Sequence, residues 1–264
     1  MELVRERTVV FDGAMGTQIQ ALDLTAEDYG GTRQNGNVDH LSVTRPDMIE
    51  QIHLGYLEAG ADVIETNSFQ ASPIRMEEWG VGDATHEINL RAAQIARRAA
   101  DAFATPSRGR FVAGAIGPSG MLPSSDDPAL SGITFNQLAD AFRAQARGLI
   151  EGGVDLLVIE TQQDILETRA AVDGCRAAFT DAGRSLPLQV QAALDVTGRM
   201  LLGTDIAAML AILHAMRVDV IGVNCSVGPE HLREPVRYLC ERAPMPVSVI
   251  PNAGLPRNVD GVAF

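Results

Sequence analysis

The sequence has few cysteines and no long apolar run, and each shortage excludes a class of protein. Three widely spaced cysteines form neither a disulfide framework nor a Cys-x-x-Cys pair, which favours a reducing compartment. No apolar run reaches membrane-spanning length, and the charged start, residues 1–7, is unlike a signal peptide. We therefore expect a cytosolic (cytoplasmic) protein with no membrane partner.

Basic residues are the scarcer of the two charged classes. The 34 acidic residues outnumber the 21 basic ones, and the formal net charge of −13 repels phosphate backbones. We therefore expect no nucleic acid partner. The 264 residues are 46 % apolar, which is enough for one large α/β domain with a substantial core. Because no linker-like or low-complexity segment divides the chain, we expect a single domain over residues 1–264.

A helix-to-strand unit recurs in the sequence. In residues 58–67 a helix ends at a glycine, an aspartate follows, and an apolar strand finishes in Glu-Thr-Asn. Residues 151–161 repeat this order and finish in Glu-Thr, while residues 217–225 are a third copy that finishes in Asn-Cys. Internal repetition of such a unit is typical of a (βα) barrel.

Seven strands are expected, starting near residues 8, 62, 111, 155, 188, 219 and 247, and a helix follows each of the first six. A closed (βα)8 barrel needs eight strands. Residues 259–264 are too short to supply a helix and another strand. The predicted fold class is therefore α/β, a (βα)8 TIM barrel that lacks its eighth strand in this chain, with unpaired edges at the first and seventh strands.

Polar side chains stand where these predicted strands end. Because the carboxyl ends of parallel strands meet at one mouth, where ligands bind, we expect these side chains to share a site. Its residues are Asp12, Glu65, Thr66, Asn67, Glu160, Asp195, Asn224, Cys225 and Asn252. Carboxylates accept a substrate ammonium, and the amides of the glycine-containing turn at residues 13–17 bind a carboxylate. With no lysine among the strand ends, the mouth suits an amino acid better than a phosphorylated substrate.

The four carboxylates at the mouth differ in how strongly they indicate function. Asp12 and Glu160 each end an apolar strand, where a carboxylate must be solvated or paired. Glu65 is equally compatible with a structural carboxylate that ties strands together inside the barrel. Asp195 is compatible with an ordinary turn, because Asp-Val-Thr-Gly is a common turn sequence.

The cysteines also divide by position. Cys225 follows the third copy of the repeated unit, and a thiolate is both a soft metal ligand and a strong nucleophile; the alternative is a cysteine that packs as a small hydrophobe. Cys175 and Cys240 lie in helical patterns with apolar neighbours, so we expect both to be packing residues. The five histidines stand at spacings that match no metal motif.

Five motifs that span nearly the whole chain resemble, in order, those of the homocysteine S-methyltransferase family. They are Asp-Gly-Ala-Met-Gly-Thr at 12–17, Gly-Ala-Asp-Val-Ile-Glu-Thr-Asn at 60–67, Val-Ile-Glu-Thr at 158–161, Gly-Val-Asn-Cys at 222–225 and Pro-Asn-Ala-Gly-Leu-Pro at 251–256. The first and last are most similar to the N-terminal homocysteine-binding module of the cobalamin-dependent methionine synthase branch. The resemblance implies a methyltransferase that converts homocysteine to methionine.

The resemblance also implies a set of cofactors and partners. The family's barrel holds Zn2+ on three cysteine thiolates, the first at the position of Cys225, which would be the catalytic and metal-binding residue. The thiol of homocysteine completes the tetrahedron and attacks a methyl group as a zinc thiolate, as an open zinc site allows. In the methionine synthase branch, methylcobalamin carries the methyl group, methyltetrahydrofolate is its ultimate donor, and cobalamin-binding and folate-binding modules of the same or another chain are partners. The implied substrate-binding residues are Asp12, Gly13, Gly16, Thr17, Thr66, Asn67, Glu160 and Asn252.

One departure from the family pattern leaves alternatives open. The family's other two zinc cysteines are adjacent, at the end of the eighth strand, and no Cys-Cys pair occurs in residues 1–264. We therefore expect a module that is C-terminally incomplete and, by itself, inactive. One alternative is a degenerate barrel that binds an amino acid or a partner protein without catalysis. Another is a metal-free barrel lyase with paired carboxylates, which leaves Cys225 unexplained. The methyl donor also stays open, because relatives that use betaine or methylmethionine share the barrel.

Overall fold

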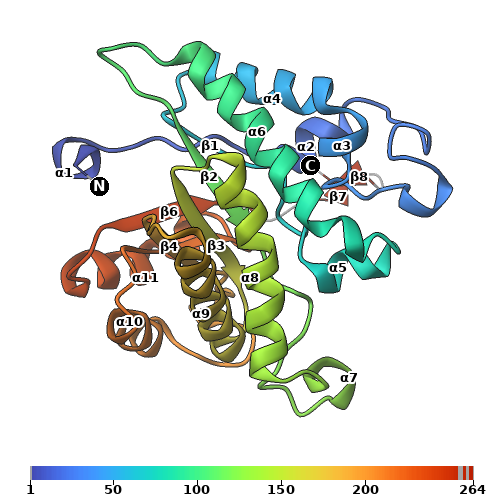
Figure 1. The fold of residues 1–264 in the computed structure, drawn as a ribbon. Coiled ribbons are helices and arrows are strands. Elements are labelled where there is room, and N and C mark those ends of the chain that lie inside the picture. The colour runs from blue at the N-terminus through green and yellow to red at the C-terminus, as the bar shows by residue number, and fades with distance from the viewer. Residues whose placement is uncertain (1, 255–257, 260–261, 264) are drawn as a thin grey trace.

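A parallel sheet forms the centre of the structure, a computed structural model that describes residues 2–254, 258–259 and 262–263. Each strand pairs with the next strand along the chain. The strands are β1 (Val63–Glu65), β2 (Phe111–Ile116), β3 (Leu156–Gln162), β4 (Leu188–Ala192), β5 (Val220–Cys225) and β6 (Val247–Pro251). The sheet is curled, and helices cover its outer side (Figure 1). This sequential, parallel and curled arrangement is that of a (βα) barrel.

Helices alternate with the strands along the chain. Helix α8 packs against both α6 and α9, and a buried cluster that includes Phe142, Leu149 and Cys175 joins the helices to the sheet. The helices are α1 (Leu3–Glu6), α2 (Met15–Gln20), α3 (Leu41–Thr44), α4 (Pro46–Ala59), α5 (Pro73–Glu78), α6 (Thr85–Phe103), α7 (Pro128–Ser131), α8 (Phe135–Gly152), α9 (Ile165–Ala182), α10 (Ile206–Ala215) and α11 (Pro229–Arg242), with short 3-10 turns η1 (Thr32–Gln34) and η2 (Gly82–Ala84).

Local sequence signals fix the ends of the helices that lead into β1 and β3. The backbone N–H of Gln137 donates to the Thr134 hydroxyl and the backbone N–H of Thr134 donates to the Gln137 side chain, so the predicted capping box opens α8. Gly60 and Gly153 end α4 and α8 with φ angles of 112° and 96°. A left-handed residue at a helix end strongly favours glycine, which explains why the repeated unit contains one.

Successive residues of each strand point to opposite faces of the sheet. Ile64 of β1 packs outward against the helices, whereas Val63 packs inward with Ala113 and Val158. Because side chains alternate along a strand, Glu65 follows Val63 on the interior face. Glu160 follows Val158 in the same way, so both carboxylates belong to the interior of the curled sheet.

The first predicted strand, at residues 8–12, is wrong as a member of the sheet, which has six strands and not seven. Residues 10–12 run beside β1 through an isolated parallel bridge of Phe11 with Val63 and backbone hydrogen bonds of 2.8 to 3.1 Å to residues 62 and 63, but they form no regular strand. The reason is that the buried carboxylate of Asp62 accepts a hydrogen bond from the backbone N–H of Val10 at 3.1 Å, and it also pairs with Arg7 at 2.6 Å. A side chain thus takes a donor that a regular ladder would use.

The sheet is open between residues 8–12 and β6. A cleft of about 820 Å³ separates them, lined by residues 4–12 on one side and 246–251 on the other. No strand of the described residues fills it. Val10 and Val249 border this cleft and are 52 % and 40 % exposed, although the valine at 112 in β2 is fully covered. The expected unpaired edge of the seventh predicted strand, β6, is therefore confirmed within the described residues, whereas the first predicted strand is only a bridge beside β1.

The end of the chain contributes no strand to this sheet within the described residues. β7 (Asn258–Val259) and β8 (Val262–Ala263) form a separate antiparallel pair. The expectation that residues 259–264 do not provide an eighth barrel strand is confirmed at positions 259, 262 and 263. Positions 260, 261 and 264 lie outside the described residues.

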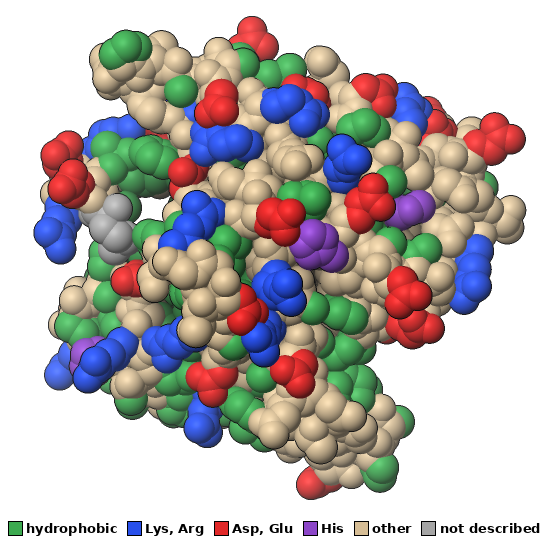
Figure 2. Space-filling model, in the orientation of Figure 1, with side chains coloured by type: hydrophobic (Ala, Val, Ile, Leu, Met, Phe, Trp, Pro, Cys, Tyr) green, Lys and Arg blue, Asp and Glu red, His purple; other side chains and the backbone are tan. Residues whose placement is uncertain are grey.

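The surface mixes both signs of charge. Figure 2 shows basic and acidic side chains interspersed over one face of the molecule. Two examples of close pairs are Arg97 with Asp155 at 2.7 Å and Arg143 with Asp181 at 2.5 Å. A search of the described residues finds no helix that is both long enough and apolar enough to cross a membrane.

Candidate functional site

The ends of β3 and β5 meet in a hydrogen-bonded group at the mouth of the barrel. The Asn224 side-chain amide donates to Glu160 Oε2 at 2.9 Å and to Thr161 Oγ1 at 2.8 Å, and its Oδ1 accepts from the Thr161 backbone N–H at 2.8 Å. Cys225 Sγ lies 3.4 Å from Asn224 Nδ2 and 3.6 Å from Thr161 Oγ1. The predicted neighbours Glu160 and Cys225 are therefore brought together, with Asn224 between them.

The backbone of this group is unusual. Thr161, Cys225 and Ser226 have φ angles of 57°, 55° and 63°, in the left-handed region that side chains other than glycine rarely adopt. Each such residue costs about 1–3 kcal/mol, and such residues concentrate at functional sites. The pairing of β3 with β4 also shifts register between Ile159 and Gln162. The irregular backbone therefore coincides with the polar group at the ends of β3 and β5.

Asp12 and Glu65 are two further carboxylates at the mouth, and they lie next to each other. The backbone N–H of Glu65 donates to Asp12 Oδ2 at 3.0 Å. Asp12 Oδ1 and Glu65 Oε1 are both buried and accept no hydrogen bond from the described residues. Burial raises the pKa of Asp12 well above its usual value, and the charge of Glu65 raises it further. The predicted Asp12 thus shares the mouth with Glu65.

The two carboxylate groups belong to one electrostatic site. Burial, then the charges of Glu65 and Asp12, raise the pKa of Glu160 well above its usual value, although the hydrogen bonds from Thr161 and Asn224 oppose this. Burial is also the main cause that raises the pKa of the Cys225 thiol, and the charges of Glu160 and Glu65 add to it. The hydrogen bond with Thr161 opposes this increase in the pKa of Cys225.

Thr66 and Asn67 lie buried next to the mouth. Thr66 Oγ1 accepts from the backbone N–H of Ala115 at 2.9 Å and shares a hydrogen bond with Ser68 at 2.6 Å. The Asn67 amide donates to the backbone oxygen of Val38 at 2.8 Å. These bonds tie the loop after β1 to its neighbours, and a contact of either side chain with substrate stays a prediction.

The turn at residues 13–17 is held against helix α4. The Tyr56 hydroxyl donates to the backbone oxygen of Ala14 at 3.1 Å, and a Cβ on Gly13 would lie 3.0 Å from the Tyr56 ring. A larger residue at position 13 would therefore have to displace the Tyr56 ring by a few tenths of an ångström. Gly16 and Thr17 fall in the first turn of α2, where Thr17 is exposed. Their role as substrate-binding residues stays a prediction.

Asn252 follows β6 at the rim. Pro251 pairs with Cys225 across the β5–β6 ladder, so Asn252 comes one residue beyond the level of the thiol, and it is exposed. Asp195, by contrast, makes an ordinary turn. Its Oδ1 accepts from the backbone N–H and the hydroxyl of Thr197 at 2.8 and 2.6 Å.

The other two cysteines differ from each other. Cys175 is fully buried in the main cluster and its pKa is raised to about 12 by burial, which confirms a packing role. Cys240 is exposed, so the expectation of packing is wrong there. Helix α11 buries Leu232, Pro235 and Leu239, and the residue after Leu239 points away from that face.

Sequence reasoning missed two partners of the site. Thr161 lies within a quoted motif, but nothing in that motif indicated that its hydroxyl faces the Cys225 sulfur. Tyr56 stands on α4, outside the quoted motifs, and carries no sequence signal for its contact with the residue 13–17 turn. Both contacts depend on elements distant in sequence.

The described residues do not fit a metal ion by themselves. A search of them finds no group of three or more His, Cys, Asp or Glu side chains arranged to hold one. Cys225 is the one thiol at the ends of β1 to β6 in the described chain. A structural zinc or catalytic zinc needs three or four protein ligands, so Cys225 alone is insufficient.

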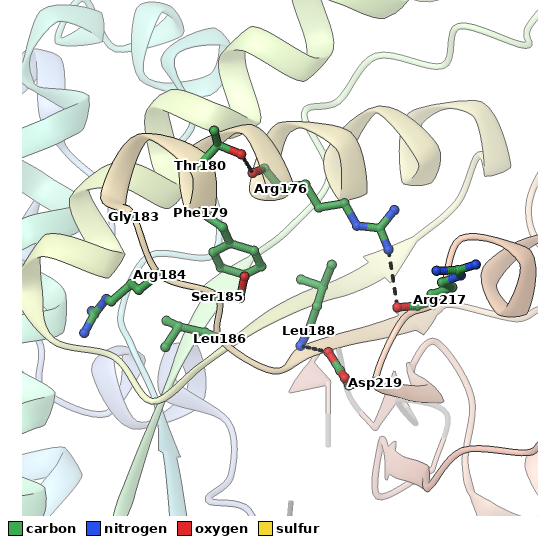
Figure 3. Close-up of a pocket in the computed structure, with 10 residues that line it drawn as sticks. All are labelled: Arg176, Phe179, Thr180, Gly183, Arg184, Ser185, Leu186, Leu188, Arg217 and Asp219. Atoms are coloured by element: carbon green, nitrogen blue, oxygen red, sulfur yellow. Dashed lines mark hydrogen bonds between the residues drawn. The ribbon is translucent and has the colours of Figure 1, made fainter.

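A different pocket lies at the opposite ends of the strands. It measures about 570 Å³ and is lined by the end of α9 and the starts of β4 and β5 (Figure 3). Arg176 donates to the backbone oxygens of Met216 and Arg217, and Arg184 donates to that of Ile150 at 2.6 Å. Ile150 lies in the last turn of α8 and Met216 is the C-cap of α10, so these arginines satisfy helix C-terminal carbonyls. The arginines that line this pocket therefore have a structural role.

Fold and site together define a parallel (βα) barrel protein with buried carboxylates and a thiol at the carboxyl ends of its strands. The model of the homocysteine S-methyltransferase family matches residues 9–263. The chain therefore belongs to this family, as its motifs predicted.

Two curated relatives are methionine synthases. The chain is 42 % identical to methionine synthase of Mycobacterium leprae (strain TN) and 41 % identical to that of Mycobacterium tuberculosis (strain ATCC 25618 / H37Rv), in each case over 256 residues. Each alignment covers 97 % of this chain and 21 % of the relative. The chain thus spans about a fifth of the length of these proteins.

Solved structures support the fold. The homocysteine methyltransferase MmuM from Escherichia coli superposes with a TM-score of 0.76 in its metallated form, at 23 % identity, over 96 % of this chain and 86 % of that one. Its apo form gives a TM-score of 0.71 over 94 % and 84 % of the two chains. The predicted TIM-barrel fold class is confirmed, with six strands of it present here.

Proposed function

We propose that this chain is the homocysteine-binding module of a methionine synthase-type methyltransferase. The observation that carries the proposal is the group of buried carboxylates within electrostatic reach of the Cys225 thiol. Family membership and the 41–42 % identity to methionine synthases support it. An amino acid with a thiol side chain needs a partner for its ammonium and a position for its sulfur, and the mouth offers both.

The chain's own residues bind and orient the substrate in this proposal. Asp12 and Glu160 accept hydrogen bonds from the ammonium, and the backbone amides of residues 13–17 bind the substrate carboxylate. Asn224 holds the Glu160 carboxylate in place at 2.9 Å. With both ends of the amino acid fixed, the substrate sulfur extends toward Cys225.

Zinc belongs to the proposal only through Cys225. We propose Zn2+ as the metal and Cys225 as one of its ligands, with adjacent cysteine thiolates from outside residues 1–264 as the others. A coordinated thiol is deprotonated, which would supply the nucleophile that buried carboxylates disfavour. Because the described residues lack the other ligands, we assign no methyl transfer to this chain alone.

The proposed partners are modules that bind cobalamin and folate. Since the chain matches about a fifth of each relative, those longer proteins have ample length for further modules. We propose methylcobalamin as the immediate methyl donor and methyltetrahydrofolate as the ultimate one. We also propose that residues 1–264 form part of a barrel domain that a further strand closes at the cleft beside Val10 and Val249.

A second candidate function is a barrel that binds an amino acid without catalysis. It is favoured by the absence of a three-ligand metal group among the described residues. Both candidates predict an amino acid site, and they differ in whether a complete domain binds metal and transfers methyl groups.

The amino acid site is tested by calorimetric titration with L-homocysteine and D-homocysteine. Fixed positions for the ammonium and the carboxylate discriminate enantiomers, so we expect the L form to bind more tightly. Asp12→Asn and Glu160→Gln should each weaken binding of the L form. Equal affinity for the two enantiomers, or no binding of either, would contradict the proposed site.

A further inference from the structure

We propose that Glu65 is a third acceptor for the substrate ammonium, together with Asp12 and Glu160, and that the three carboxylates select a protonated primary amine. This inference rests on the proposed function, because it concerns how the same site recognises its amino acid. It adds a specificity-determining residue to the two carboxylates that the family resemblance implies.

The position of Glu65 on the interior face of β1 brings it toward Glu160. Glu65 stands two positions after Val63, and Glu160 stands two positions after Val158. These two valines pack together inside the sheet with Ala113. Strand β2 lies between their strands, and its interior side chain at position 113 is only a methyl group. Alternation along β2 puts Ala115 on the same face. The space between the two carboxylates is therefore not filled by a long side chain of β2.

The hydrogen-bonding capacity of this group is incompletely used. Asp12 Oδ1 and Glu65 Oε1 are buried and receive no hydrogen bond from the described residues. Glu160, whose residue is only 8 % exposed, receives hydrogen bonds only at Oε2 from them. Buried carboxylate oxygens without donors carry a large desolvation cost. Such oxygens at a mouth point to a donor that arrives with a ligand.

The described residues offer these three carboxylates no cation. The chain contains no lysine. Among the described arginines, no side-chain nitrogen lies within 4.0 Å of the carboxylates of Asp12, Glu65 or Glu160. Asp62 shows the contrast, since Arg7, Arg108 and Arg110 all lie within 4.0 Å of its buried carboxylate.

An ammonium matches this arrangement in number as well as in charge. A primary ammonium has three N–H donors and no acceptor, and Asp12, Glu65 and Glu160 can each accept one hydrogen bond. A hydroxyl or a neutral amide brings fewer donors and no charge. A secondary ammonium brings only two donors. The site should therefore distinguish homocysteine from analogues that lack the amine or carry a methyl group on it.

The test compares two thiols on the wild type and on Glu65→Gln. L-Homocysteine and 4-mercaptobutanoic acid share the thiol and the carboxylate, and only the first has an amine. Calorimetry should show a wild-type preference for homocysteine that falls about ten- to a hundredfold in Glu65→Gln, the range of a charge-assisted hydrogen bond. A merely structural role would weaken both thiols alike and leave their ratio unchanged, which would overturn the inference.

Glu167→Gln is the matched control. Glu167 is another fully buried glutamate with one unpartnered oxygen, but it accepts its hydrogen bonds from Ser119 at 2.7 and 2.5 Å. We expect this variant to keep the wild-type ratio of the two affinities. A Glu167→Gln ratio that fell as far as that of Glu65→Gln would contradict a specific role for Glu65.

A ligand variant keeps the inference testable if Glu65→Gln does not fold. N-Methyl-L-homocysteine should bind wild-type protein at least tenfold more weakly than L-homocysteine, because it lacks one of three donors. Equal affinities would overturn the three-acceptor site while leaving the proposed function intact. Wild-type protein that binds homocysteine no better than 4-mercaptobutanoic acid, or binds neither, would overturn the proposed function as well.

Discussion

The Asn224 amide donates to the Glu160 carboxylate across the barrel mouth, from β5 to β3, at 2.9 Å. The same nitrogen lies 3.4 Å from Cys225 Sγ. One side chain thus fixes the spacing between the proposed ammonium acceptor and the proposed metal ligand. Because the two methylene groups of homocysteine limit how far its sulfur can lie from its amine, this spacing is what a homocysteine site has to control.

Glu160→Gln should weaken homocysteine binding about ten- to a hundredfold, since it removes a charged partner of the substrate ammonium. In a longer chain that carries the adjacent cysteine pair, the zinc content should stay unchanged, because Glu160 is not a proposed zinc ligand. Calorimetry and metal analysis of the same preparation measure the two effects. An unaltered dissociation constant would remove Glu160 from the site.

Asn224→Ala should destabilise the protein by about 1–3 kcal/mol, because it leaves the Thr161 backbone N–H without its acceptor and removes one of the two donors to Glu160 Oε2. Urea unfolding measures the change. Gln20→Ala, at the exposed end of α2, is a suitable control and should stay within about 0.5 kcal/mol of the wild type. Wild-type stability in Asn224→Ala would mean that water or another group satisfies both partners.

The stability of the protein should fall as pH rises through the range set by Glu167. Burial raises the pKa of Glu167 from 4.5 to about 7 in the folded protein. The folded state therefore binds its proton more tightly than the unfolded state, so the stabilisation is complete below about 4.5 and is lost between about 4.5 and 7. The full effect is about 3 kcal/mol.

Glu167→Gln tests this pH dependence because a glutamine does not titrate. Urea unfolding at pH 5 and pH 8 should give a smaller loss of stability for the variant than for the wild type. Asp181, an exposed acid paired with Arg143, has its pKa lowered, so Asp181→Asn is a control that should not reduce the loss. Equal losses in wild type and Glu167→Gln would assign the proton uptake to other groups.

Much of the fold was predictable because its signals are local. The glycines at 60 and 153 and the capping box at Thr134 mark helix ends through contacts within a few residues. The polar ends of β1, β3 and β5 follow from where each apolar run stops. The loss of the strand predicted at residues 8–12 could not be foreseen. It depends on the carboxylate of Asp62, about fifty residues away, which competes for the backbone N–H of Val10.

The candidate site was predictable in its membership and less so in its geometry. Asp12, Glu160 and Cys225 were expected to share a mouth because parallel strands end together. The left-handed backbone at Thr161 and Cys225 carries no sequence signal, since neither residue type favours it. The bridging position of Asn224 depends on how β3 and β5 are placed across β4, which tertiary packing decides.

The last prediction concerns metal binding by residues 1–264. Cys225 lacks two thiolate partners among the described residues, and the cleft of about 820 Å³ beside β6 has room for further chain. We therefore expect this protein to bind no stoichiometric zinc and to show no methyl transfer. A longer chain with an eighth strand that carries Cys-Cys should regain both functions. It should also gain stability from metal, because folding and ligand assembly are coupled.

Metal analysis after dialysis, with thermal melts with and without zinc, compares the two proteins. Cys225→Ser in the longer chain is the control that should lose the metal. One zinc per molecule held by residues 1–264 and lost on Cys225→Ser would show that other residues of this chain complete the coordination.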